Sequence, residues 1–208
     1  MAEVANIWAR YGVDIRASCE NDERRDGAIK LVVVLADDRV KDPAAGALGS
    51  ILFVDGVPRP TIFMHPKVID GLVSSATVMG LSDRQLTSGF HNFIVGRVFG
   101  RALAHEIGHY LLRSPSHSAK GLMRALQFTP DLVGQDCELF ALSADQVIRL
   151  DSLLTQITRA DNPAEKVSGA SKPAGRGIRG VWKRRLFSLF VLAARTLGVS
   201  EVRTPAPV

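Results

Sequence analysis

A long helical pattern that carries ionisable side chains on a mostly apolar surface constrains this chain more than any other feature. Residues 88–112 show apolar residues at helical spacing, and the second half is rich in alanine, leucine and isoleucine. Within it stand His105, Glu106 and His109, in the order His-Glu-Ile-Gly-His. Buried histidine and glutamate side chains need partners, which a metal ion can supply. The pattern therefore predicts a buried helix with a metal site.

The spacing of these three residues fits a particular chemistry. His105 and His109 are four residues apart, so their imidazoles project from one face of a helix and can reach one Zn²⁺ at about 2.0–2.1 Å. Glu106 projects from a neighbouring face, close to a metal-bound water. This is the H-E-x-x-H arrangement, in which zinc lowers the pKa of the water and the glutamate takes its proton.

A catalytic zinc needs a third protein ligand and one open position. His117 is the only histidine after the motif, and Pro115 forces the helix to end before it. The turn could bring His117 under the metal, so we expect His117 to be the third ligand. An acid is the alternative, with Glu138 ahead of Asp131 and Asp136.

The segment HEIGHYLLRSPSHSAKGLM resembles the metzincin signature, H-E-x-x-H-x-x-G-x-x-H followed by a Met-turn. This clan includes the matrix metalloproteinases, and the resemblance implies that Met123 lies below the zinc and supports the three histidines. The sequence departs from the signature at two positions. The family glycine falls at Leu112 and the family histidine at Pro115, so the connection to His117 is two residues longer.

The resemblance covers residues 4–157 loosely and 98–157 more closely. It implies an α+β fold with a twisted, mixed, zincin-like sheet, a long active-site helix, a Met-turn and a C-terminal helix that begins near residue 143. It also implies that an edge strand pairs through its backbone with an extended substrate peptide. The residues expected to do so are Leu48, Gly49 and Ser50.

The rest of the body fits the same class. Helical spacing of apolar residues predicts helices at 3–11 and 66–76, and a capping box at Ser143 and Gln146 opens another. Apolar β-branched runs predict strands at Ile29–Leu35, 50–54 and 61–64. The two remaining histidines of this region, His65 and His91, are expected to be structural or at the surface.

Charge and composition divide the chain into three parts. Residues 161–208 hold nine Lys and Arg and three acids, which leaves 17 of the 26 basic and 18 of the 21 acidic residues in 1–160. The net charge of +5 therefore belongs to the tail, and we expect no nucleic-acid groove. We expect a zinc peptidase domain at 1–160, a flexible linker at 161–180 and a basic, apolar helix and tail at 181–208.

The tail and the ends of the chain give further expectations. The apolar run 186–194 is too short to span a bilayer, so residues 181–199 are expected to lie on an anionic membrane or to dock on the body or another subunit. The first residues do not resemble a signal peptide, which indicates a cytoplasmic protein, or a secreted one if the N-terminus is truncated. Cys19 and Cys137 could form one bridge or stay free.

These observations favour an endopeptidase with one catalytic Zn²⁺ that hydrolyses a peptide or protein substrate, with Glu106 as general base. The alternative is a zinc-stabilised binding or regulatory module without activity, which the altered spacing before His117 and the missing signal peptide motivate. A third option is a membrane-surface adaptor that uses the tail and has a structural zinc.

Overall fold

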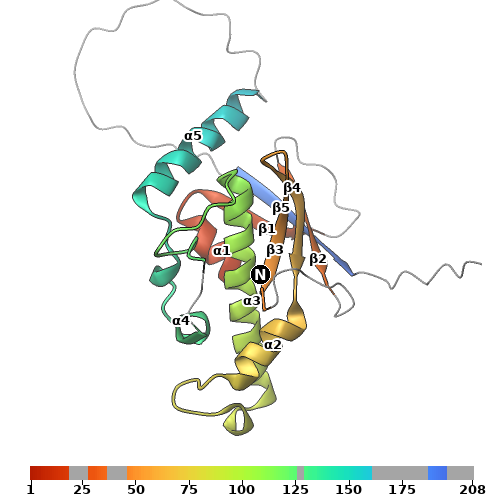
Figure 1. Ribbon diagram of the computed structural model, residues 1–208, viewed down its shortest axis with the longest axis vertical. Helices are drawn as coiled ribbons and strands as arrows, with labels where there is room; N and C mark the ends of the chain where they lie inside the picture. Colours follow the sequence, from red (N-terminus) through yellow and green to blue (C-terminus); the bar gives the residue numbers. More distant parts are fainter. Residues whose placement is uncertain (19–27, 37–45, 126–128, 161–186, 196–208) are drawn as a thin grey trace, which may run out of the picture.

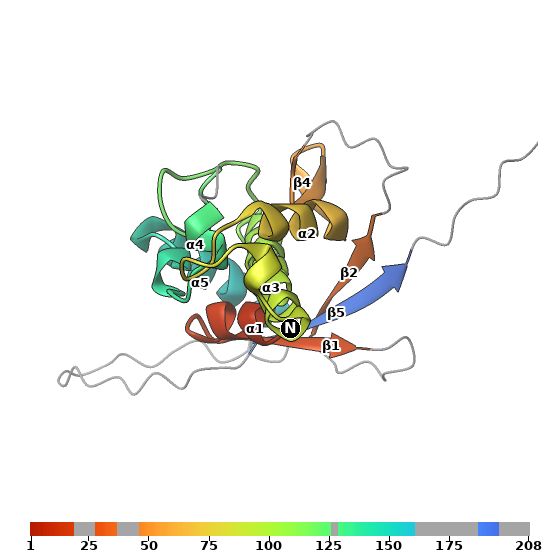
Figure 2. The same cartoon turned by 90° about the horizontal axis from the view of Figure 1, so that it is seen from below.

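A computed structural model describes residues 1–18, 28–36, 46–125, 129–160 and 187–195. This part of the chain combines helices with one mixed five-stranded sheet, which agrees with the α+β class. In both Figure 1 and Figure 2 the helices lie on one side of the sheet. The strands are β1 (Val13–Ser18), β2 (Ile29–Leu35), β3 (Gly49–Val54), β4 (Val57–Met64) and β5 (Phe187–Arg195).

The strand order is β1-β5-β2-β4-β3, and only β3 runs antiparallel to its neighbour. β3 and β4 form a hairpin whose two turn residues, Asp55 and Gly56, both have positive φ angles, 53° and 75°. An Asp-Gly pair is favoured there because both positions of this turn need left-handed backbone. β3 is therefore an edge strand, with Gly49 opposite Met64 and Ile51 opposite Ile62.

The expectation of a helix in 181–208 is wrong where the structure describes that segment. Residues 187–195 form strand β5, which pairs in parallel with β1 on one side and β2 on the other. A near-continuous apolar run is typical of a central parallel strand, and a run of nine residues is too short for periodicity to separate strand from helix. The proposed linker 161–180 and the rest of 181–208 lie outside the described residues.

The helices are α1 (Ala2–Ala9), α2 (Pro66–Ser75), α3 (Ser88–Leu111), α4 (Thr129–Val133) and α5 (Ala144–Ala160), with short 3₁₀ turns η1 (Asp83–Gln85) and η2 (Glu138–Phe140). As expected, Ser143 and Gln146 form the capping box of α5. α3 is the central helix and packs on the sheet and on α1 (Figure 1). A Cβ on Gly100 would lie 2.6 Å from Cβ of Glu3, so this glycine lets α1 approach α3.

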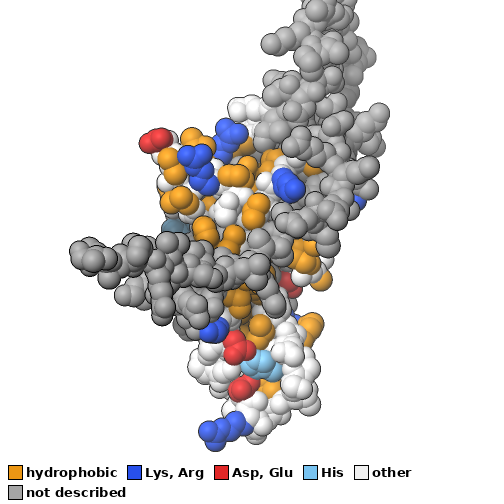
Figure 3. Space-filling model, turned by 90° about the vertical axis from the view of Figure 1, so that its right-hand side faces the viewer, with side chains coloured by type: hydrophobic (Ala, Val, Ile, Leu, Met, Phe, Trp, Pro, Cys, Tyr) orange, Lys and Arg blue, Asp and Glu red, His pale blue; other side chains and the backbone are white. Residues whose placement is uncertain are grey.

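The side of the molecule away from α4 and α5 carries exposed apolar side chains. Figure 3 shows them gathered between Lys and Arg side chains and the segments drawn grey. The β3–β4 hairpin carries exposed apolar side chains as well, since Leu52 and Val57 are 58% and 59% exposed. In the described part of the chain, the helices are too short or too polar to cross a membrane.

Candidate metal centre

The His-Glu-Ile-Gly-His motif lies in the most buried part of α3. The helix begins where the Thr87 side chain accepts a hydrogen bond from the Phe90 N–H at 3.3 Å. Every residue from 100 to 109 is buried, His105, Glu106 and His109 included. The apolar pattern read from the sequence therefore predicts both the helix and its burial correctly. The ionisable groups of the motif are thus largely shielded from bulk water and need other partners.

The end of α3 fixes the orientation of His109. Arg113 is in the left-handed region with φ 46°, and the N–H groups of Arg113 and Ser114 donate to the carbonyls of Tyr110 and His109. This bond pattern is a Schellman motif, which satisfies the last carbonyls of the helix. The carbonyl of Ser114 then accepts from Nδ1 of His109 at 2.7 Å. The left-handed position falls one residue after Leu112, where the metzincin signature has glycine.

A second turn orients His105. Nδ1 of His105 lies 2.7 Å from the carbonyl oxygen of Leu122, and the Leu122 N–H donates to the Ala141 carbonyl at 3.0 Å. The next residue, Met123, is fully buried. A Cβ on Gly108 would collide with Sδ of Met123, so the methionine fits directly against the glycine of the motif. Met123 therefore packs against α3 between the positions of His105 and His109.

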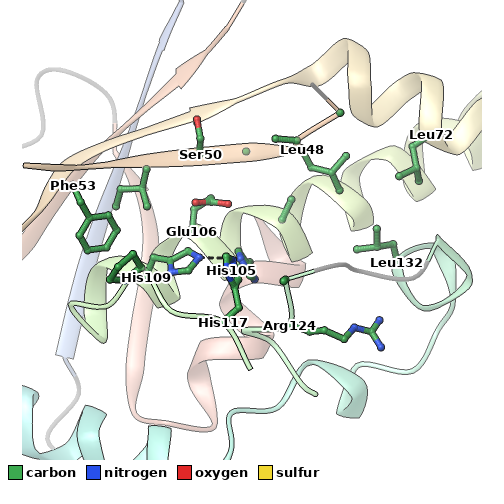
Figure 4. Close-up of a pocket in the computed structure, with 17 residues that line it drawn as sticks. Leu48, Ser50, Phe53, Leu72, His105, Glu106, His109, His117, Arg124 and Leu132 are labelled. Atoms are coloured by element: carbon green, nitrogen blue, oxygen red, sulfur yellow. Dashed lines mark hydrogen bonds between the residues drawn. The ribbon is translucent and has the colours of Figure 1, made fainter. Parts of the chain in front are cut away.

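The two histidines of the helix are arranged to bind a cation. A carbonyl only accepts hydrogen bonds, so in both neutral rings Nδ1 carries the hydrogen and Nε2 carries a lone pair. The two Nε2 atoms lie 3.0 Å apart, along the dashed line in Figure 4. Two lone pairs at this distance repel each other, and a metal ion coordinated by both removes the repulsion. The backbone carbonyls thus set both ligands in the state that metals need.

Burial also keeps these rings neutral. It lowers the pKa of His105 to about 4, an effect to which the neighbouring His109 and His117 add. Burial likewise lowers the pKa of His109, although its hydrogen bond to Ser114 opposes the change. A neutral ring is the form that coordinates a metal.

His117 completes a group of three. One ligand nitrogen from each of His105, His109 and His117 lies within 4.8 Å of the others. Nitrogens on a tetrahedral zinc are about 3.4 Å apart, so small movements of the exposed His117 ring suffice to close the site. The ring of His117 stacks on that of His105 with centroids 5.3 Å apart. The group could hold a metal ion, and imidazole nitrogens suit zinc, copper, iron or nickel.

The acids considered as alternatives to His117 have other partners. Glu138 is 74% exposed and forms an ion pair with Arg10 at 2.9 Å. Asp131 pairs with Arg124 at 2.7 Å, and the side chain of Asp136 accepts from the Glu138 N–H. None of the three belongs to the metal-ligand group found among the described residues. His91 binds Asp83 and Asp70 and is likewise not part of that group.

Glu106 lies between the histidines and the edge strand β3. Figure 4 shows its carboxylate pointing toward the strand segment that carries Ser50. A Cβ on Gly49 would lie 3.0 Å from Cγ of Glu106 and 2.9 Å from Sδ of Met64. Glycine at this position therefore lets the strand pass close over the glutamate.

A cavity of about 570 Å³ opens over the histidines and Glu106. On one side it is lined by β3 and the residues before it, including Leu48, Gly49 and Ser50, and at the far end by Arg124 and Leu132. The sequence placed Leu48, Gly49 and Ser50 at a substrate strand, and the structure brings all three to this cavity.

No family model, curated protein or solved structure matches this chain. The resemblance to metzincins therefore stays one of sequence motif.

The sequence interpretation missed Arg101. Its side chain is 1% exposed and donates to Glu3 of α1 at 2.7 Å and to the carbonyls of Leu132 and Gly134 at 3.0 and 2.9 Å. It connects α3 to α1 and to the cavity wall at α4. A signal was present, because Arg101 lies four residues before His105 on an apolar stretch of the same helix.

Proposed function

We propose that this protein is a zinc-dependent endopeptidase with a metzincin-like catalytic centre. The observation that carries the proposal is the pair of Nε2 atoms of His105 and His109, 3.0 Å apart, with both Nδ1 atoms committed to backbone carbonyls. Two nitrogens so arranged suit one metal ion. Glu106 beside them and the edge strand above them supply the base and the peptide-binding backbone that peptide hydrolysis needs. The buried Met123 and the position of His117 favour a metzincin over other zinc peptidases.

A bound zinc ion would act as a Lewis acid, lowering the pKa of water and polarising the scissile carbonyl. Glu106 accepts a proton from the attacking water as the water oxygen bonds to the carbonyl carbon of the substrate. The same carboxyl then gives the proton to the leaving nitrogen as the carbon–nitrogen bond breaks. Burial of Glu106 beneath Gly49 keeps the carboxylate close to one position during both transfers.

The edge strand offers a binding mode for the substrate. A peptide that lies along β3 adds a strand to the sheet through backbone hydrogen bonds, which bind an extended chain independently of its side chains. Leu48, Gly49 and Ser50 line the cavity beside Glu106, so a peptide paired with them passes over the catalytic groups. This arrangement favours cleavage within a chain.

The test is the variant Glu106→Gln in zinc-loaded protein. We expect it to keep one zinc ion per chain and to lose roughly 10²–10⁴-fold in cleavage of a casein-type substrate. Glu138→Gln is the matched control, because Glu138 pairs with Arg10 outside the cavity. Zinc content by elemental analysis accompanies each rate.

If wild-type protein binds zinc but cleaves nothing, the inactive binding module replaces this proposal. Undiminished cleavage by Glu106→Gln would instead remove the general base from the mechanism.

A further inference from the structure

The cavity continues past the histidines into a pocket with apolar sides. Leu48, Leu72, Ala102 and Leu132 line it, from the segment before β3 and from α2, α3 and α4. In Figure 4 the three leucines lie on the side of His105 away from His109. A side chain of a peptide bound along β3 has room to enter between them.

Arg124 adds a positive charge to this pocket. It follows Met123, whose full burial fixes the backbone there, and the Ser118 N–H donates to the Met123 carbonyl at 2.7 Å. The Arg124 side chain is 30% exposed and lines the cavity. Figure 4 shows its guanidinium near Leu132, away from the three histidines.

Asp131 positions this guanidinium without removing it from the cavity. The two groups lie 2.7 Å apart, and both side chains are partly exposed, at 30% and 27%. Asp131 itself is not among the residues that line the cavity. Among the described residues that do, Arg124 is the only arginine or lysine, and the only acid is Glu106 beneath β3. The two opposite charges are therefore at different parts of the cavity.

We propose that this pocket selects an acidic side chain, glutamate above all, next to the scissile bond, through Arg124. The inference rests on the proposed peptidase function. Arginine binds carboxylates through charge-assisted hydrogen bonds in a fixed, planar geometry. The methylene groups of glutamate lie against the leucines while its carboxylate reaches Arg124. A leucine side chain gains the apolar contact but offers Arg124 no carboxylate.

The test compares peptides that differ only at this position, which carries Glu, Gln or Leu. Binding is measured by fluorescence anisotropy on zinc-loaded Glu106→Gln protein, and cleavage on zinc-loaded wild-type protein. We expect the Glu peptide to bind about tenfold more tightly than the Leu peptide, the effect of one charged hydrogen bond. Adding Arg124→Gln reduces the ratio to near one. Arg149→Gln, outside the cavity, is the matched control and leaves the ratio unchanged.

Asp131→Asn gives a second test in which Arg124 stays. The asparagine keeps a side-chain oxygen that accepts from Arg124 but lacks the competing negative charge, so we expect the preference for Glu to rise above the wild-type ratio. A wild-type preference for Leu, or a ratio that neither variant changes, overturns the proposal. If wild-type protein cleaves no peptide but Arg124 governs binding of the Glu peptide, the peptidase proposal fails and the proposed pocket for an acidic side chain stands. If wild-type protein cleaves the peptides without a preference for Glu, the peptidase proposal stands and the proposed role of Arg124 fails.

Discussion

The two sides of the cavity are held in different ways. Around the three histidines, backbone carbonyls at Ser114 and Leu122 orient His109 and His105, all within one stretch of the chain. At the α4 wall, side chains reach across long sequence distances, as Arg101 does to Glu3 and Leu132. The chemical centre thus depends on local backbone geometry, while the pocket wall depends on buried charge. Substitutions at the two sides should therefore have separable effects.

The largest effect is expected at the wall, from Arg101→Met. The substitution leaves Glu3 and the α4 carbonyls without their buried donor, which should lower the free energy of unfolding by roughly 3–5 kcal/mol. Urea denaturation measures this loss. Arg97→Met is the control, because Arg97 is only half-buried and, within the described residues, donates to the carbonyls of Val133 and Gly134. About 1–2 kcal/mol is expected there. Equal losses would show that Arg101 is not the central connection.

On the metal side, Gly108→Ala should place a methyl group against Sδ of Met123. Overpacking costs about 1–3 kcal/mol, which exceeds the gain of roughly 0.5–1 kcal/mol from removing a helical glycine. We therefore expect net destabilisation in chelator and weaker zinc binding by titration. Gly96→Ala on the same helix has nothing within 4 Å of the new methyl group and should be stabilising. A stable Gly108→Ala protein with unchanged zinc affinity would contradict the role of this contact.

The turn after α3 gives a smaller effect of opposite sign. Arg113→Gly relieves a left-handed residue with φ 46°, and we expect a gain of about 0.5–1 kcal/mol in thermal or chemical unfolding. Leu112→Gly, at the position where the metzincin signature has glycine, should instead lose at least about 2 kcal/mol because Leu112 is buried and right-handed. A gain at Leu112 and a loss at Arg113 would mean that the helix ends one residue earlier.

The smallest effect concerns α2, which carries Leu72 of the pocket. His91 lies 3.0 Å from Asp70 of α2 and 2.6 Å from Asp83, and these hydrogen bonds raise the pKa of His91 above its usual value. The folded state therefore gains stability that is fully present below the ordinary pKa near 6.5 and lost as pH rises through the higher folded value. Because Asp70 is 61% exposed, less than about 1 kcal/mol is expected. In wild-type protein the free energy of unfolding should therefore be higher at pH 6 than at pH 9 by this amount. The His91→Gln variant should lack this difference between the two pH values, and Asp70→Asn should reduce it.

The contrast between the two sides also explains what the sequence could predict. His105, Glu106 and His109 could be located because four-residue spacing on a helix fixes their relative positions. His117 and Met123 follow within a short, turn-rich segment, so their approach could be anticipated from Pro115 and from the metzincin resemblance. Even so, the sequence did not show that Arg113 would be the left-handed residue.

Arg101, Arg124 and β5 could not be assigned in the same way. The place of Arg101 on the apolar stretch of α3 indicates that it is buried, but its partners lie 30 to 98 residues away and could not be identified from the sequence. Arg124 stands beside a predicted turn without any periodic pattern. The apolar run that forms β5 fits a short helix equally well, and only its pairing with β1 and β2 decides the matter.

The position of β5 has a consequence for how the chain reaches its native state. The strand nearest the end of the described chain separates β1 from β2, which are the first two strands in sequence. During synthesis these two strands exist long before the partner that joins them, and their inner edges stay open to other chains in that interval. Completion of the sheet requires a contact between residues near 13 and 187, which is slow to form. A fragment that stops at residue 160 would keep His105, His109 and His117 but lack β5, the strand that joins β1 to the rest of the sheet.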